Sequence, residues 1–110
     1  MKDLAALRRR YEQDPPAVQV GGLASNLSRI AWFMKRQDAS QALEPIFRES
    51  KYFAEWAAGH TSLEVQEVLA EVQLHLALWQ RRVAKGDPLD SIMDEPQKWS
   101  EKLLTIVGLI

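Results

Sequence analysis

Residues 62–85, SLEVQEVLAEVQLHLALWQRRVAK, decide the fold, because they contain neither proline nor glycine and their apolar pattern is unbroken. One apolar row recurs at steps of three and four residues, the spacing of a helix face that packs into a core. Its members are Leu63, Val65, Val68, Leu69, Val72, Leu76, Trp79 and Val83. The pattern predicts one helix of about six turns over this stretch.

A second apolar row lies on a different side of the same predicted helix. It consists of Ala70, Leu74 and Ala77, and it is separated from the first row by Gln66, Gln73 and Gln80, which are spaced seven residues apart. A helix that is apolar on two sides needs a neighbour on each side. We therefore expect this helix to be either the centre of a bundle or one half of a dimer interface.

Composition limits the class of protein. The chain has 110 residues, of which 46% are hydrophobic and 26% charged, values typical of one soluble globular domain that spans residues 1–110. The net charge of -1 gives no overall attraction to nucleic acid or to an anionic membrane. With no cysteine, the chain has no disulfide, thiolate nucleophile or cysteine-ligated metal. No signal peptide or membrane span is recognisable, so we expect a cytoplasmic protein.

Prolines and glycines divide the rest of the sequence into helical segments. Besides the long helix, helices are expected over about 2–13, 22–36, 40–58 and 88–106. No segment has the alternation of a strand bounded by turns. The expected fold is all-α, a four- to five-helix bundle with a long central helix over about 62–85 and a short leading helix.

Local signals suggest where the second and third helices begin. The glycine pair at 21–22 is interpreted as a flexible entry to the second helix. The third helix is expected to have its cap at Asp38 or Ser40. Because Pro45 is comfortable only in a first turn, the regular part of that helix is expected to start at about Glu44.

Similar signals mark the last two helices. Thr61 and Glu64 have the spacing of a capping box at the start of the long helix. The final helix is expected to begin at residues 87–88 and to kink at Pro96. The alternative is two short pieces, with Asp94 capping the second one.

Four tryptophans lie one in each of the four later helices: Trp32, Trp56, Trp79 and Trp99. The simplest interpretation places them at the corners of the bundle core. Adjacent aromatic pairs at 32–33 and 52–53 favour a second interpretation, a stacking platform for bases or a planar ligand, because two adjacent rings cannot both face one core. The apolar tail, residues 103–110, must either fold onto the core of its own chain or be buried against another subunit. Candidate partner contacts are Trp32, Trp56, Trp79, Leu109 and Ile110.

Two sets of polar residues could form binding sites. Glu64, Glu67, Glu71 and His75, with His60 just ahead of them, could face one way as metal ligands. A di-iron bundle, however, repeats Glu-x-x-His, and this chain does not. We interpret them as a solvated acidic face and expect no metal or cofactor. Arginines near the carboxyl ends of helices could contact phosphates if they converged, or could complement helix dipoles. These candidate anion contacts are Arg8, Arg9, Arg10, Arg36, Arg81 and Arg82.

Several segments together resemble a small family of uncharacterised helical proteins of cyanobacterial type. They are GGLASNLSRI at 21–30, ESKYFAEW at 49–56, QLHLALWQ at 73–80 and WSEKLLTIVGLI at 99–110. The resemblance spans nearly the whole chain. It implies a compact all-α cytoplasmic protein and no assigned activity, and Pro96 departs from its pattern.

The sequence favours a non-enzymatic protein-interaction module. No nucleophile elbow and no phosphate-binding glycine pattern occurs, so no enzymatic activity is expected. The two apolar sides of the long helix and the apolar tail favour a homodimer or another protein partner. The alternative is a helical binder of nucleic acid or of an acidic ligand through the clustered arginines; no membrane contact is expected.

Overall fold

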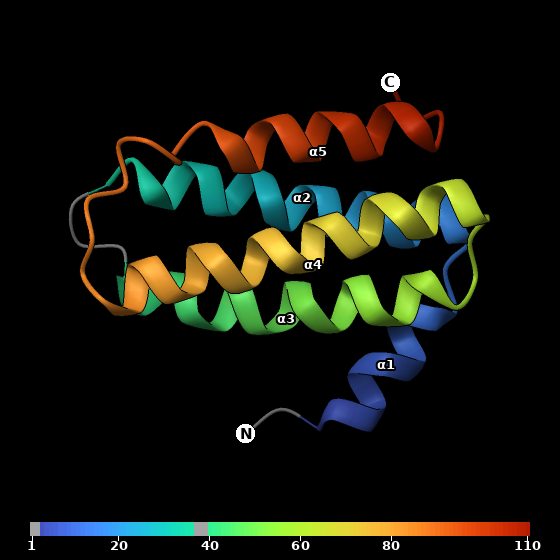
Figure 1. Ribbon diagram of the computed structural model, residues 1–110. Coiled ribbons are helices and arrows are strands. Elements are labelled where there is room, and N and C mark those ends of the chain that lie inside the picture. The colour runs from blue at the N-terminus through green and yellow to red at the C-terminus, as the bar shows by residue number, and fades with distance from the viewer. Residues whose placement is uncertain (1–2, 37–39) are drawn as a thin grey trace.

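The computed structural model describes residues 3–36 and 40–110, and within these ranges it contains helices and no strand. The helices are α1 (Leu4–Glu12), α2 (Pro16–Met34), α3 (Ser40–Ala58), α4 (Leu63–Ala84) and α5 (Glu95–Ile106). Four long helices lie side by side and α1 projects from them (Figure 1). The predicted all-α bundle with a short leading helix is confirmed, as is one long helix close to 62–85.

The order of the helices around the bundle determines which faces are covered. α2 packs closely against both α3 and α5, and α4 packs closely against α3 but only loosely against α5. α1 contacts α3 and α2. α2 and α3 therefore each have two close neighbours, whereas α4 has one close and one loose neighbour (Figure 1).

The core lies between the four long helices and is built from the apolar faces that the periodicity predicted. Many of its large side chains are less than 2% exposed. They include Leu23, Leu27, Ile30, Leu43, Phe47, Leu69, Leu76, Trp79 and Leu103. The first apolar row of α4 contributes Val65, Val68, Leu69, Val72, Leu76 and Trp79 to this core, so that row is correctly assigned.

α2 begins earlier than the sequence suggested. It starts at Pro16, whose fixed backbone and missing N–H suit the first helical position. The glycines lie inside the helix, so their interpretation as a flexible entry is wrong. A Cβ atom added at Gly21 would lie 2.9 Å from Leu109 Cδ1, and one at Gly22 would lie 3.7 Å from Tyr11 Cε1. These positions bring other segments close to the α2 backbone.

α3 spans Ser40–Ala58, in agreement with the expected range of about 40–58, but it is regular from its start and Pro45 lies inside it. The expected start of the regular part at Glu44 is therefore wrong. Of the two suggested caps, Ser40 is the first residue of the helix, and Asp38 lies outside the described residues. Proline cannot donate to the carbonyl four residues before it, here that of Gln41. Gln41 and Pro45 are both exposed, so this part of the helix adjoins solvent, which can bond the carbonyl.

The cap of α4 is Ser62 and not Thr61. The Ser62 hydroxyl accepts a hydrogen bond from the Val65 amide at 3.4 Å. Thr61 Oγ1 is buried and has no hydrogen-bond partner within the described chain. The predicted capping box is wrong, because the helix starts one residue later than the box requires and Val65 occupies the position of its glutamate.

α5 starts at Glu95, with Asp94 at the cap position and Pro96 in the first turn. The kinked helix expected from residue 88 is wrong. The alternative, a separate helix with Asp94 at its cap position, is correct, although the Asp94 side chain forms no cap hydrogen bond. The segment before it, which was expected to be a first short helix, contains turns at residues 90–94 and no helix. Ile92 is nevertheless buried, at 7% exposure. A turn can thus place an apolar side chain where a helix was expected to place it.

None of the helices over residues 3–36 and 40–110 combines the length and the apolar character that crossing a bilayer requires.

Candidate functional site

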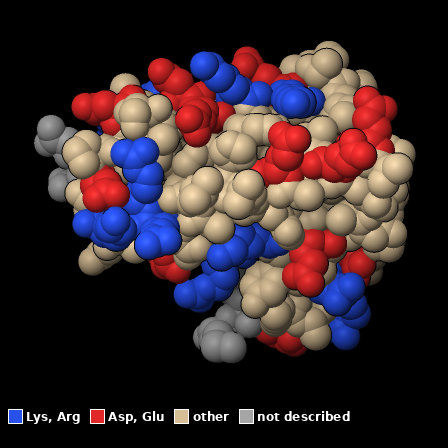
Figure 2. Space-filling model, viewed as in Figure 1, with Lys and Arg blue, Asp and Glu red and all other residues tan. Residues whose placement is uncertain are grey.

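α4 carries an apolar face that no other part of the described chain covers. We call it the α4 outer face and define it by Leu63, Glu64, Glu67, Ala70, Glu71, Leu74, Ala77, Leu78, Arg81 and Lys85, all of which are exposed. Leu74 is 59% exposed and Leu78 50%. Figure 2 has the same view as Figure 1, in which α4 crosses the middle of the molecule. Uncharged residues, drawn in tan, extend across this region. The second apolar row, Ala70, Leu74 and Ala77, is therefore not part of the core of one chain.

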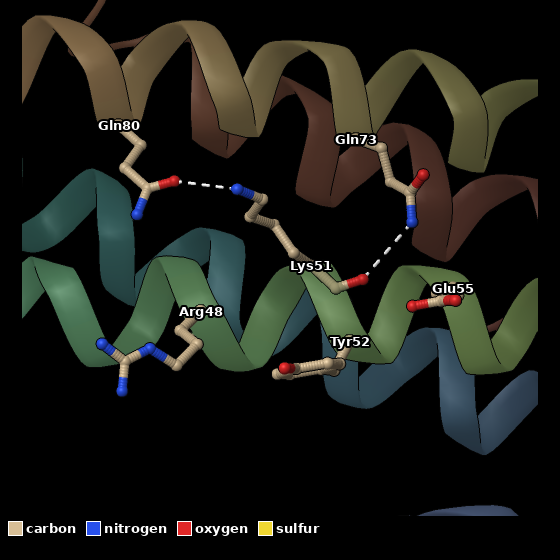
Figure 3. A pocket seen from close by; sticks show the side chains of 6 residues that line it. All are labelled: Arg48, Lys51, Tyr52, Glu55, Gln73 and Gln80. Carbon is tan, nitrogen blue, oxygen red and sulfur yellow. Dashed lines mark hydrogen bonds between the residues drawn. The ribbon is translucent and has the colours of Figure 1, made fainter.

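The three spaced glutamines form the border between this face and α3. Gln73 Nε2 donates to the Lys51 carbonyl at 3.3 Å, and Gln80 Oε1 accepts from Lys51 Nζ at 3.0 Å. Figure 3 shows these two contacts between α4 and α3. Gln80 Nε2 also reaches the Glu44 carboxylate, at 3.0 and 3.2 Å. At the start of α4, Gln66 bonds two carbonyl oxygens at 2.9 and 3.2 Å. The glutamines hold α4 against its own chain.

A hollow of about 460 Å³ lies beside these contacts, between α3 and α4 (Figure 3). Its lining is Arg48, Lys51, Tyr52, Glu55, Gln73 and Gln80. Lys51, Gln73 and Gln80 use their polar groups for bonds between the two helices. We interpret the hollow as part of the helix–helix contact rather than as a ligand site.

The charges on the α4 outer face are separated by sign. Glu64, Glu67 and Glu71 lie in the first half of α4, and Arg81 and Lys85 lie at its end. Within the described residues, the side chains of these five form no ion pair. They are therefore available to charges of the opposite sign outside the chain.

The arginines proposed as anion contacts do not form one site. Arg8, Arg9 and Arg10 lie on α1, and the other three lie at the ends of α2 and α4 (Figure 1). Arg8 Nε donates to Glu12 at 2.9 Å, and the Arg36 guanidinium stacks on Trp32 at 4.5 Å.

Arg82 is held by the turn that follows α4. Its nitrogens lie 3.9 Å from Asp87 Oδ2, 3.0 Å from the Pro88 carbonyl and 3.3 Å from Ser91 Oγ. Arg8, Arg36 and Arg82 thus already have partners in the chain, and the interpretation that these residues complement helix dipoles stays a prediction.

The tryptophans divide between core and surface. Trp79 is 1% exposed and donates from Nε1 to Glu95 Oε1 at 3.0 Å, and Trp56 is 5% exposed and stacks with Tyr52. Because both are buried, Trp56 and Trp79 lie outside the surface that a partner could contact. Trp32 is 55% exposed. It lies on α2, away from the α4 outer face.

The tail is only partly covered. Leu109 Cδ1 lies over the backbone of Gly21, and the Leu109 amide donates to the Leu104 carbonyl at 2.8 Å. Leu109 is still 47% exposed and Ile110 is 69% exposed. The tail was expected either to fold onto its own chain or to be buried against another subunit. Leu109 partly folds onto its own chain, because it lies over α2.

α1 is attached to the bundle by aromatic and polar contacts around Tyr11. The Tyr11 ring stacks on Phe53 at 4.1 Å, and its hydroxyl donates to the Gln19 carbonyl. Burial raises the pKa of Tyr11, so this hydroxyl stays protonated. The hydrogen bond with His60, at 2.9 Å, lowers the pKa of Glu12, and Arg8 contributes to the same shift.

The histidines and glutamates that could have formed a metal site are separated. His75 Nδ1 donates to the Glu71 carbonyl at 2.8 Å and its ring lies against Trp99. His60 instead pairs with Glu12. Over the part of the chain that the structure describes, no group of three or more histidine, aspartate and glutamate residues is placed to hold a metal ion.

Leu78 and the separation of charge along α4 were missed by the sequence reasoning. Leu78 follows Leu74 by four residues, and Glu67, Leu74 and Arg81 are spaced by seven. This regular spacing was the available signal. The resemblance to an uncharacterised helical family stays a prediction, since no family model, no curated protein and no solved structure matches this chain.

Proposed function

We propose that the protein is a non-enzymatic interaction module that forms a homodimer through the α4 outer face. The observation that carries this proposal is the exposure of Leu74 and Leu78, 59% and 50%, side by side on a regular helix. Contiguous apolar residues that face water on an ordered element mark a contact surface more often than singly scattered ones do.

The surroundings of these leucines support helix–helix contact. Ala70 and Ala77 flank them, and small side chains let a second helix approach to about 8–10 Å between axes. The opposite side of α4 is anchored by its core row and by the glutamine contacts to α3. The surface is thus already ordered before binding, and less conformational entropy is lost when a partner docks.

Sedimentation velocity of the full chain tests the proposal over concentrations from about 1 µM to about 1 mM, the range in which small interfaces dissociate. The wild type should change from the 12.6 kDa mass of one chain to twice that mass. Leu74→Glu should remain monomeric over the same range. Val18→Glu is the matched control, because Val18 is a similarly exposed apolar residue (46%) on α2.

A single 12.6 kDa species for the wild type at every concentration would refute the proposed homodimer. Equal loss of association in Leu74→Glu and Val18→Glu would place the contact elsewhere. The cytoplasmic location remains part of the proposal, and cell fractionation would test it. The arginine-based alternative has less support, because the six arginines are spread over α1, α4 and the end of α2, and Arg8, Arg36 and Arg82 already have partners within the chain.

A further inference from the structure

The order of charges on the α4 outer face has a direction. Glu64, Glu67 and Glu71 come before Leu74, and Arg81 and Lys85 come after it. We propose that two copies dock α4 against α4 in antiparallel orientation, about a two-fold axis that passes beside Leu74. This inference rests on the homodimer proposed above and adds its geometry.

An antiparallel pair about Leu74 places residues at equal distances from Leu74 opposite each other. Glu67 and Arg81 are each seven residues away, so Glu67 of one copy faces Arg81 of the second copy, and the same pair forms again by symmetry. A parallel pair would place Glu67 against Glu67 and Arg81 against Arg81. Charges that flank an apolar helix seam set the orientation of the partner in this way.

The helix dipole accounts for only part of the charge order. Its influence falls off within the first and last turns of a helix. Glu64 lies in the first turn of α4, and Arg81 lies in the last. Glu67 and Glu71 lie beyond the first turn, and within the described residues neither carboxylate has an ion-pair partner. In the antiparallel pair a second copy supplies a partner for Glu67, namely Arg81.

The apolar residues fit the same axis. Ala70 and Leu78 are each four residues from Leu74, so in the antiparallel pair a small side chain faces a large one at two symmetric places. Leu74 meets Leu74 of the second copy at the axis. In a parallel pair Leu78 would face Leu78 and Ala70 would face Ala70, which leaves one crowded and one empty layer.

Reversing the charges tests the orientation. Glu67→Arg and Arg81→Glu should each raise the dimer dissociation constant by about tenfold or more, because each homodimer then contains two like-charge contacts. An equimolar mixture of the two variants should dimerise as tightly as the wild type, because its heterodimer contains only opposite charges at these positions. Glu101→Arg, an exposed reversal on α5, is the matched control and should behave as the wild type.

Cysteine cross-linking gives an independent result, because the chain contains no cysteine of its own. Under mild oxidation Leu74→Cys should form a disulfide-linked dimer. Ala70→Cys should not, since in the antiparallel pair its two copies lie about eight residues, or roughly 12 Å, apart along the helices. Efficient linking of Ala70→Cys would overturn the antiparallel arrangement in favour of the parallel one.

Failure of this inference is distinct from failure of the homodimer. A wild type that dimerises, loses dimerisation in Leu74→Glu and is not restored by mixing the two charge reversals would reject the antiparallel axis alone. Tighter association of Glu67→Arg with the wild type than with Arg81→Glu would reject it as well. A wild type that stays monomeric would reject both proposals.

Discussion

Leu74 and Leu76 allow the sidedness of α4 to be measured with one type of substitution. The two leucines are two residues apart, on opposite sides of the same helix. Leu76 is 0% exposed in the core and Leu74 is 59% exposed. Leucine-to-alanine substitutions at these positions differ only in which side of the helix they change. Leu76→Ala should therefore weaken the fold, and Leu74→Ala should weaken association.

The magnitudes follow from the two exposures. Leu76→Ala removes a fully buried side chain and leaves a cavity, so the free energy of unfolding should fall by about 3–4 kcal/mol. Complete burial of a leucine side chain is worth about 2 kcal/mol, and more than half of Leu74 already faces water, so Leu74→Ala should cost about 1 kcal/mol or less. The alanine at 74 also keeps a high helix propensity.

Urea denaturation followed by tryptophan fluorescence measures both values at about 1 µM, where dimerisation would add little to the apparent stability. Thermal unfolding should agree, with a Tm roughly 15 °C lower for Leu76→Ala and a change of only a few degrees for Leu74→Ala. Sedimentation at high concentration should give the opposite order, with association lost in Leu74→Ala. Equal losses of unfolding free energy in the two variants would refute the assignment of one buried and one free side.

Three further predictions concern other parts of the molecule. Ser100→Ala should lower the free energy of unfolding by about 1–2 kcal/mol in urea denaturation, because the buried Ser100 hydroxyl bonds the Ala24 carbonyl at 2.7 Å and Ser28 Oγ at 2.9 Å; an unchanged value would contradict it. The His60 hydrogen bond lowers the pKa of Glu12 below its usual 4.5, so ionised Glu12 stabilises the fold above that pH, and the contribution is lost as the pH falls through the lowered pKa. Glu12→Gln should therefore show a flatter decline of Tm between about pH 5 and pH 3, and identical profiles would disprove the link. The full chain should pass through heparin at about 0.1 M salt, and retention that disappears near about 0.2 M would support the anion-binding alternative.

The long helix was predictable because its evidence is local. No proline or glycine interrupts residues 62–85, and the core row repeats through them, so helix type and length follow from the chain itself. The start of α2 was not predictable in this way. The glycines at 21–22 resemble a break, but Leu109 and Tyr11 approach the α2 backbone there, and both contacts join residues that are not neighbours in the helix. Local rules contain no information on such approaches.

Pro45 and Pro96 show a second limit of local reasoning. Pro45 is tolerated inside α3 where the helix adjoins solvent, whereas Pro96 lies in the first turn of α5. The apolar spacing continued across Pro96 because Ile92 is buried from a turn. Apolar periodicity indicates which side chains face the core. A helix and a series of turns can both produce the same spacing of core residues.

The candidate surface depended on a fact that periodicity does not contain, namely which apolar row has a neighbour in the same chain. Before that was known, Glu64, Glu67 and Glu71 could be interpreted only as a solvated acidic face. In the structure, α3 covers the glutamine side of α4, and nothing in the described chain covers Leu74. The same glutamates therefore lie beside an exposed apolar surface. Their order relative to Arg81 then has a physical consequence, because a second identical helix can place Arg81 opposite Glu67 only when it runs the opposite way.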